Sequence, residues 1–306
     1  MNFLDLTFPT PAENLAADEA LLDWCDETGG PEMLRFWEPR EHFVVVGYAN
    51  KVATEVHTDA CAESHVPILR RCSGGGTVLQ APGCLNYSLI LRIIEGGSLA
   101  SINSANRFIM ERNRAAIERL LLDTGRGQLD ARALSSPSPP PGEERAGVRR
   151  PLVSISNPLT PVLSPLGRGE GADPAATARP RQNEVNTGGS QLSIQGHTDL
   201  AVNGLKFSGN AQRRKKTHLL FHGTFLLHFD LPLVEKFLAM PSLQPDYRQG
   251  RRHPEFITNL PVSAAAVKQA LCAAWSAAQP LENCPHDRIQ SLVHDRYVTN
   301  GWNFKF

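Results

Sequence analysis

The chain has 306 residues, enough for one large or two modest domains with a full-sized hydrophobic core. Its 31 Lys and Arg balance 31 Asp and Glu, so net charge gives no reason to expect nucleic acid or a membrane surface as a partner. The six cysteines lack C-x-x-C spacing. The first residues show no basic region followed by an apolar region, the pattern of a secretory leader, and no apolar run approaches the roughly 20 residues of a membrane span. Together these features predict a soluble, cytoplasmic protein with free thiols.

The first part of the chain alternates between helix-like and strand-like stretches. Residues 12–25 and 103–122 place apolar side chains at helical spacing. Short runs rich in β-forming residues predict strands in the region between these helices, at 33–37, 43–47, 77–79 and 87–93.

A proline-rich segment interrupts this pattern. It runs from about residue 125 to residue 189 and holds ten of the 23 prolines. Such a composition cannot bury enough apolar surface to offset the entropy of ordering the chain. We therefore predict a disordered insertion at about residues 126–188, inside a single catalytic domain that spans residues 1–306.

The pattern of short elements resumes after the insertion. Residues 192–202 and 219–228 read as strands, and residues 263–275 read as a helix that Ser263 would cap. The strand-like runs are close neighbours without regular βαβ units. The sequence therefore predicts an α+β domain on a mixed, mostly antiparallel sheet with packed helices.

Three glycines, Gly74, Gly75 and Gly76, follow two arginines and a serine in the string LRRCSGGGTV. A glycine run lets the backbone approach a ligand closely and leaves N–H groups free to face oxyanions. The alternative is a flexible hairpin turn. The neighbouring Arg70, Arg71 and Ser73 favour an anionic ligand, because a guanidinium group binds phosphate or carboxylate through paired donors.

A second motif places a lysine directly after a tight turn. Asn203-Gly204 is typical of a type I′ turn, so residues 200–202 and 206–207 should pair as a hairpin. Lys206 would then lie on a rigid strand, where its ammonium group can polarise a carbonyl and balance a phosphate. A solvated lysine on an edge strand is the alternative. The neighbouring Ser208-Gly209-Asn210 and the basic run 213–216 favour the functional interpretation.

Two further strings are FHGTFLL at 221–227 and ITNL at 257–260. A histidine before glycine in a strand is either a hydrogen-bonded structural residue or a ligand contact, and His222 remains a candidate for both.

These strings together resemble the lipoate–protein ligase A family. RRCSGGGTVLQAPGCLNYS is similar to the family pattern RRxSGGGxVxHxxGxxNxS, and DLAVNGLKFSGNAQRRKK is similar to its lysine hairpin. FHGTFLL and ITNL resemble its HHGTLLL and xTNL strings, in the same order. The chain departs from the pattern at Gln80, where the family usually has histidine.

The resemblance implies a lipoate/biotin ligase-like catalytic domain that uses ATP, with its Mg²⁺, to convert lipoate or octanoate into an acyl-adenylate. The acyl group would then pass to a lysine of a carrier, either a lipoyl domain of a 2-oxoacid dehydrogenase or the glycine-cleavage H protein. Lys206 matches the lysine that contacts the acyl carbonyl and the phosphate. The resemblance places the other substrate and nucleotide contacts at Arg70, Ser73, Gly74, Gly75, Gly76, Thr77, Asp199, Ser208, Gly209, Asn210, His222, Gly223 and Thr224.

Other activities on the same fold stay open. An octanoyltransferase would use a cysteine thioester instead of ATP, but the matching neighbourhoods 191–193 and 218–222 contain no cysteine. Cys72 and Cys84 lie near the glycine loop, where a relocated nucleophile is conceivable. A biotin ligase lacks support because RRCSGGG replaces its GRGRxGR-like loop. A non-catalytic binding homologue is the remaining alternative.

The last residues, 297–304, resemble the end of the large catalytic domain in this family. We therefore expect no C-terminal accessory domain. Adenylation would then need a separate accessory polypeptide, or the enzyme would use preformed acyl-adenylate.

The insertion gives a first testable prediction. Deleting residues 130–186 should preserve folding and activity, because the segment is predicted to lie on a surface connection. Limited proteolysis of the intact chain should cut there first. An insoluble or inactive deletion variant would contradict this prediction.

Overall fold

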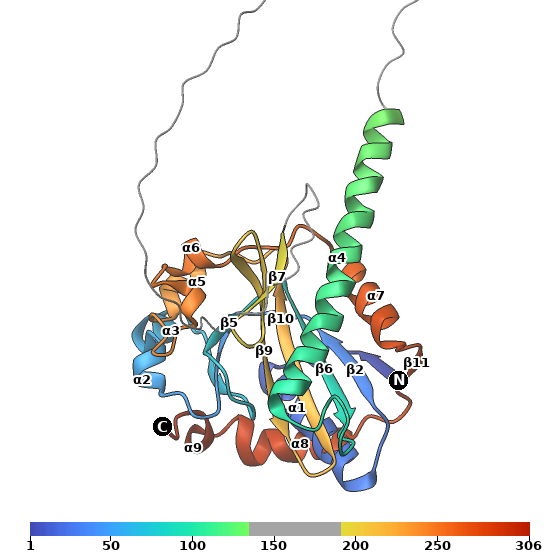
Figure 1. The fold of residues 1–306 in the computed structure, drawn as a ribbon. Helices are drawn as coiled ribbons and strands as arrows, with labels where there is room; N and C mark the ends of the chain where they lie inside the picture. The colour runs from blue at the N-terminus through green and yellow to red at the C-terminus, as the bar shows by residue number, and fades with distance from the viewer. Residues whose placement is uncertain (135–190) are drawn as a thin grey trace, which may run out of the picture.

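A computed structural model describes residues 1–134 and 191–306, without the side chains of residues 125–134. An eight-stranded sheet, in the order β11-β1-β2-β6-β10-β9-β8-β7, forms the centre of the domain (Figure 1). Its strands are β1 (Asn2–Asp5), β2 (Met33–Trp37), β6 (Cys84–Arg92), β7 (Leu192–Gln195), β8 (Asp199–Val202), β9 (Leu205–Arg214), β10 (His218–Leu226) and β11 (Gln279–Pro280).

Both pairings of β1 are parallel, and every pairing from β2 to β7 is antiparallel. The predicted mixed, mostly antiparallel α+β class is confirmed. A second sheet has the order β4-β3-β5 and consists of β3 (Phe43–Val46), β4 (Ile68–Arg70) and β5 (Val78–Gln80).

Helices cover both faces of the large sheet (Figure 1). α4 (Ile102–Leu134) and α7 (Ala264–Trp275) share a core with Leu219 and Phe221 of β10, whereas Leu220 packs with α1 (Pro11–Thr28). Successive side chains of a strand point to opposite faces. His222 and Thr224 therefore lie on the α1 side. The remaining helices are α2 (Val52–Glu55), α3 (Thr58–Glu63), α5 (Leu233–Phe237), α6 (His253–Phe256), α8 (His286–Leu292) and α9 (Asn300–Asn303), with single turns η1 (Asp246–Arg248) and η2 (Val293–Tyr297).

Local sequence signals explain several element boundaries. Ser263 caps α7 by accepting a hydrogen bond from the backbone of Ala266, as predicted. Asn203 and Gly204 have φ values of 51° and 76°, and Val202 pairs with Leu205 across them. The predicted two-residue hairpin turn is confirmed.

Two predicted boundaries were wrong. The run 192–202 is two strands, because the chain turns at Gly196, which has a φ of 55°. Helix α4 continues to residue 134, into the range predicted as insertion, and the rest of that range lies outside the described residues. Within the residues described, no helix has the length and apolarity needed to cross a membrane.

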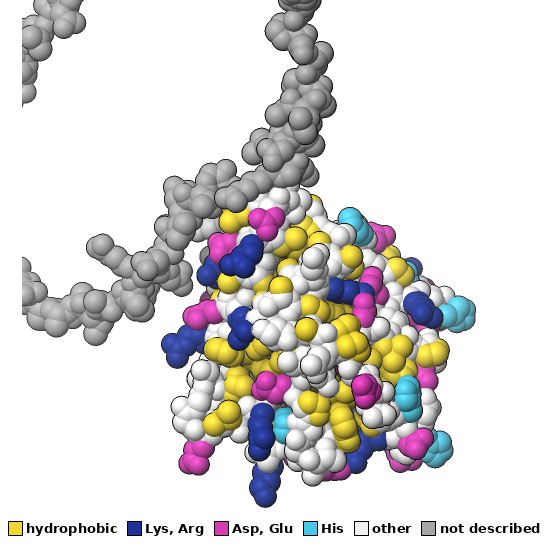
Figure 2. Space-filling view, turned by 90° about the vertical axis from the view of Figure 1, so that its right-hand side faces the viewer, with side chains coloured by type: hydrophobic (Ala, Val, Ile, Leu, Met, Phe, Trp, Pro, Cys, Tyr) yellow, Lys and Arg dark blue, Asp and Glu magenta, His cyan; other side chains and the backbone are white. Residues whose placement is uncertain are grey.

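Charged side chains of both signs occur on the surface. On the face shown in Figure 2, acidic and basic side chains are interspersed with apolar ones, and neither sign dominates.

A buried ion pair joins the sheet to α1. The Arg35 guanidinium on β2 is fully buried and lies 2.6 Å from Asp18 Oδ1 on α1. It also donates to the backbone oxygen of Asn14 at 3.0 Å and to its side-chain oxygen at 2.9 Å. These contacts fix α1 over the sheet.

Replacing Arg35 with leucine should lower the free energy of unfolding by about 3–5 kcal/mol, because it leaves the Asp18 carboxylate buried without a counter-charge. Urea denaturation measures this loss. Lys268→Met removes a more exposed lysine that pairs with Asp5 and Glu38, and should cost at most about 1 kcal/mol. Equal losses in the two variants would contradict the assigned role of the buried pair.

Candidate functional site

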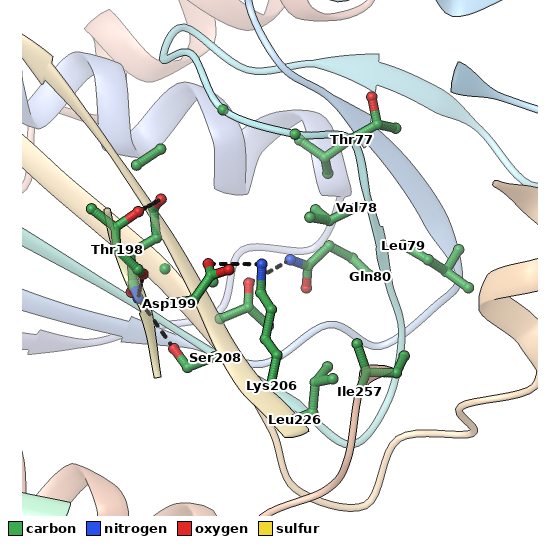
Figure 3. Close-up of a pocket in the computed structure, with 18 of the residues that line it drawn as sticks. Thr77, Val78, Leu79, Gln80, Thr198, Asp199, Lys206, Ser208, Leu226 and Ile257 are labelled. Carbon is green, nitrogen blue, oxygen red and sulfur yellow. Dashed lines mark hydrogen bonds and ion pairs between the residues drawn. The ribbon is translucent and has the colours of Figure 1, made fainter. Parts of the chain in front are cut away.

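A cavity of about 360 Å³ lies between the glycine loop, the β8–β9 hairpin, β10 and the segment 241–257 (Figure 3). One part of its wall is apolar and includes Leu79, Leu226, Phe229, Val234, Leu238 and Ile257. The other part carries charged and polar groups from Arg71, Asp199, Lys206 and Asn210. The cavity therefore suits a molecule with an apolar tail and a charged or polar head.

The glycine loop covers the polar part of the cavity. Gly75 has a φ of 89°, which favours glycine. The loop also passes very close to Gly47, where an added Cβ would overlap the Gly75 carbonyl oxygen. Within the described residues, the N–H groups of Gly74, Gly75 and Gly76 donate no hydrogen bond. These exposed donors can receive the oxygens of an anionic ligand.

The two arginines before the loop have different roles. Arg70 does not line the cavity, so its predicted ligand contact is not supported. Its guanidinium group is buried and donates to backbone oxygens of Gly47, Tyr48, Asn50, Trp302 and Asn303.

Arg71 does line the cavity, and its guanidinium group donates to Ser73 Oγ and to the carbonyl oxygens of Gly74 and Gly76. Burial lowers the pKa of Arg71 to about 10. The group remains charged at neutral pH, and no described carboxylate pairs with it. An anionic ligand would supply this missing counter-charge.

Lys206 projects into the cavity from β9 (Figure 3). Its Nζ lies 2.8 Å from Asp199 Oδ1, and the Tyr247 hydroxyl donates to the other oxygen of Asp199 at 2.7 Å. Gly209 leaves room for the lysine, because a Cβ there would lie 2.8 Å from both Lys206 Cε and Nζ. The Thr258 N–H donates to the Lys206 carbonyl oxygen, so the ITNL segment fixes the strand that carries the lysine.

A chain of hydrogen bonds connects the helical layer to Asn210. Trp275 Nε1 on α7 donates to Asn113 Oδ1 on α4, and Asn113 Nδ2 donates to the Tyr87 hydroxyl at 2.8 Å. That hydroxyl donates to Asn210 Oδ1 at 2.7 Å, while Asn210 Nδ2 donates to the Thr198 carbonyl oxygen. Asn210 is therefore held in one orientation before any ligand binds.

Gln80 stands where the ligase family pattern has histidine, and its side-chain amide makes several hydrogen bonds. Its Nε2 donates to Thr224 Oγ1 at 2.7 Å and to Asn86 Oδ1 at 3.0 Å, and its Oε1 accepts from Asn86 Nδ2 at 2.9 Å. The amide therefore ties β5 to β6 and β10 without an imidazole.

His222 contacts two residues that the sequence does not connect. Its Nδ1 lies 3.0 Å from Asp18 Oδ2 and its Nε2 lies 2.6 Å from Ser73 Oγ. His222 and Asp18 line the cavity, whereas Ser73 is buried beside them. Burial alone would raise the pKa of Asp18, but the Arg35 charge and the hydrogen bond with His222 lower it, so the carboxyl group is ionised.

The structure brings together eleven of the predicted site residues. These line the cavity and are Gly75, Gly76, Thr77, Asp199, Lys206, Ser208, Gly209, Asn210, His222, Gly223 and Thr224. Arg70, Ser73 and Gly74 do not line it. The predicted site residues did not include Asp18, Arg71 or Tyr247. A carboxylate pair in the otherwise apolar string AADEALL is the one signal that singles out Asp18.

The cysteines are placed away from this chemistry. In the part of the chain that the structure describes, which contains all six, none lines the cavity. Burial raises the pKa of the Cys84 thiol to about 12 and raises that of Cys72 further. The Cys72 and Cys84 thiols are therefore protonated and weakly nucleophilic at neutral pH.

Fold and cavity together define an enzyme-like site whose apolar wall and cationic groups can accommodate an apolar tail and an anionic head. The lipoyl protein ligase A/B catalytic domain family matches residues 10–119 and 175–276, so the chain belongs to that family. It is an enzyme of the group that joins lipoyl or octanoyl groups to proteins. The unmatched residues 120–174 overlap the predicted insertion.

Octanoyltransferase LipM of Geobacillus kaustophilus is 24% identical over 99% of this chain and 97% of its own. A bi-partite lipoate protein ligase from Thermoplasma acidophilum, solved with its E2 lipoyl domain, has a TM-score of 0.66 at 19% identity, over 99% of this chain and 95% of that chain. A crystal structure of lipoate-protein ligase A bound with ATP has a TM-score of 0.64 at 21% identity, over 99% of both chains. The two structural matches establish the shared fold.

Gly223 tests how tightly the site is packed. A methyl group at this position would overlap Asn210 Oδ1 and lie 2.9 Å from the Gly209 carbonyl oxygen. Gly223→Ala should therefore lower the free energy of unfolding by about 1–3 kcal/mol, as measured by thermal or urea denaturation. Gly301→Ala is the matched control, because nothing lies within 4 Å of the added methyl group. A Gly223 variant as stable as this control would contradict the described packing.

Proposed function

We propose that this enzyme activates octanoate or lipoate with ATP and transfers the acyl group from the resulting adenylate to a lysine of a lipoyl carrier domain. One observation carries the proposal. Two cationic groups, Lys206 and Arg71, and the free N–H groups of the glycine loop converge on an apolar cavity that contains no thiol. This arrangement suits a mixed anhydride of a fatty acid and a phosphate better than a thioester intermediate.

The apolar wall would hold the acyl chain, and its carboxyl group would lie at the polar end near Lys206. Attack of the carboxylate oxygen on the α-phosphorus of ATP forms the acyl-phosphate bond and releases pyrophosphate. The Lys206 ammonium group would move partly away from Asp199 and contact both the acyl carbonyl oxygen and the phosphate. Positioning and charge neutralisation supply most of the rate in such a reaction.

The described residues contain no cluster of three or more metal-ligating side chains. Mg²⁺ would therefore enter with the phosphates of ATP. The acceptors would be lipoyl domains of 2-oxoacid dehydrogenases or the glycine-cleavage H protein, and a separate accessory polypeptide would assist adenylation if this domain alone adenylates slowly.

Direct transfer from an octanoyl thioester is the second candidate. The name of the Geobacillus kaustophilus relative, octanoyltransferase LipM, favours it. A covalent version would need a nucleophile in the cavity, and the burial of Cys72 and Cys84 argues against those thiols.

Pyrophosphate release separates these functions. The enzyme should release pyrophosphate when ATP, octanoate or lipoate, and an unmodified lipoyl domain are present, in proportion to the domain that is acylated. Acylation from an octanoyl thioester without ATP, and no pyrophosphate with free acids, would favour the second candidate. A non-catalytic homologue would do neither.

Lys206→Ala should slow single-turnover adenylate formation by about a hundredfold or more, equivalent to about 3 kcal/mol, because it removes the charge that opposes the developing phosphate charge. Binding of the free acid should change less. Lys206→Arg should not restore the rate, since a planar fork cannot replace a compact ammonium group on a fixed strand.

Lys215→Ala is the matched control for Lys206. Lys215 is also 2.8 Å from an aspartate, Asp23, but does not line the cavity. Circular dichroism checks the folding of all three variants. A folded Lys206→Ala protein that forms adenylate at the control rate would refute the role of this lysine.

A further inference from the structure

Ser73, His222 and Asp18 form a hydrogen-bonded chain at the edge of the cavity. The three residues come from different elements: Asp18 from α1, His222 from β10 and Ser73 from the start of the glycine loop. The His222 ring lies between the other two, with Nδ1 3.0 Å from Asp18 Oδ2 and Nε2 2.6 Å from Ser73 Oγ.

The roles of the hydrogen bonds in this chain follow from one tautomer of the His222 ring. The Asp18 carboxyl group is ionised and its other oxygen is held by Arg35 at 2.6 Å, so a hydrogen on His222 Nδ1 faces an acceptor. With that hydrogen on Nδ1, Nε2 is an acceptor for the Ser73 hydroxyl, whose oxygen also accepts from Arg71 Nε at 3.1 Å. A serine hydroxyl, an imidazole and a buried carboxylate in this order can withdraw a proton from the serine end.

Acyl transfer to a lysine requires such a proton acceptor, because the amine must lose protons to become a neutral amide. Two other candidate groups in the cavity are engaged. Asp199 holds Lys206 and Tyr247, while His253 Nε2 contacts the Ala239 carbonyl oxygen. His197 also lines the cavity, but it is exposed and none of the described contacts orients its ring. His222 is the histidine of the cavity whose ring a buried carboxylate orients.

We propose that Ser73, His222 and Asp18 are a proton relay for the lysine of the carrier domain. This inference rests on the proposed function and assigns its second step. The relay takes the first proton of the lysine ammonium group, which passes through a water molecule to Ser73 Oγ while the Ser73 proton moves to His222 Nε2. Asp18 stabilises the imidazolium that results. The neutral amine then bonds to the acyl carbon as the bond from that carbon to the adenylate oxygen breaks, and AMP leaves with the electron pair. The second proton leaves the nitrogen to solvent as the amide forms.

Ser73 is well placed for a relay and poorly placed for a covalent intermediate. It is 1% exposed and is not part of the cavity wall, so an acyl carbon has little access to its oxygen. A proton needs much less space. The next residue along the chain, Gly74, is exposed, so Ser73 lies directly beside the exposed part of the loop.

The test compares two acceptors in single-turnover reactions that start from preformed octanoyl-adenylate. One acceptor is the lipoyl domain, whose lysine arrives protonated. The other is hydroxylamine, which is largely unprotonated at neutral pH and has less need of a base. Ser73→Ala and His222→Gln should each slow transfer to the lipoyl domain by about a hundredfold and slow hydroxamate formation by less than about tenfold.

His294→Gln is the matched control. His294 lies 2.8 Å from Asp295 in an exposed pair outside the cavity, and its variant should match wild type with both acceptors. If only one of the Ser73→Ala and His222→Gln variants folds, that variant alone completes the test. Equal loss with both acceptors would show that the chain only positions the loop, and an octanoyl group trapped on Ser73 would show a nucleophile; either result overturns the relay.

The same experiment distinguishes failure of the relay from failure of the proposed function. If wild type does not use octanoyl-adenylate but does use an octanoyl thioester, the adenylate proposal is wrong. The two-acceptor comparison, repeated with the thioester donor, then still decides whether the relay exists.

Discussion

The buried pair of Arg35 and Asp18 is the contact on which the site depends. One oxygen of Asp18 neutralises a guanidinium group that has no exposure to solvent, and the other orients His222. His222 in turn contacts the first residue of the glycine loop. A single carboxylate thus links α1, the centre of the sheet and the loop over the cavity. Removing a buried charge of this kind leaves its partner without compensation.

The cavity is assembled before substrate binds. Lys206 is held by Asp199, Asn210 by Tyr87 and Thr198, and the glycine loop by Arg71. Hydrogen-bond donors that are already in place need little reorganisation when phosphate charge develops, which is why such sites stabilise transition states well. Arg71 adds a positive charge that no described carboxylate balances, which favours an anionic ligand.

The sequence predicts the lysine hairpin well, because a type I′ turn requires positive φ at two successive residues, and Asn-Gly is a preferred pair for such a turn. Asn203 and Gly204 both have positive φ. The sequence analysis selects Arg70, whereas Arg71, the next residue along the chain, lines the cavity. Successive residues of an extended segment point to opposite sides, and the pairing of β4 with β3 decides which side faces the cavity. The Ser73, His222 and Asp18 contacts were also missed, since they join residues 149 and 204 positions apart. The packing of α1 on the sheet brings Asp18 to His222, and the position of the glycine loop over β10 brings Ser73 to the same ring.

In the proposed reaction the acyl group reaches the carrier from an adenylate and without a thiol intermediate. The most direct measurement is the intact mass of an unmodified lipoyl domain after incubation with the enzyme and either octanoate with ATP or an octanoyl thioester without ATP. We predict that the domain gains one octanoyl group with octanoate and ATP, and that a version of the enzyme with all six cysteines replaced by serine or alanine, if folded, does the same. Acylation from the thioester alone, lost in the cysteine-free enzyme, would contradict the account.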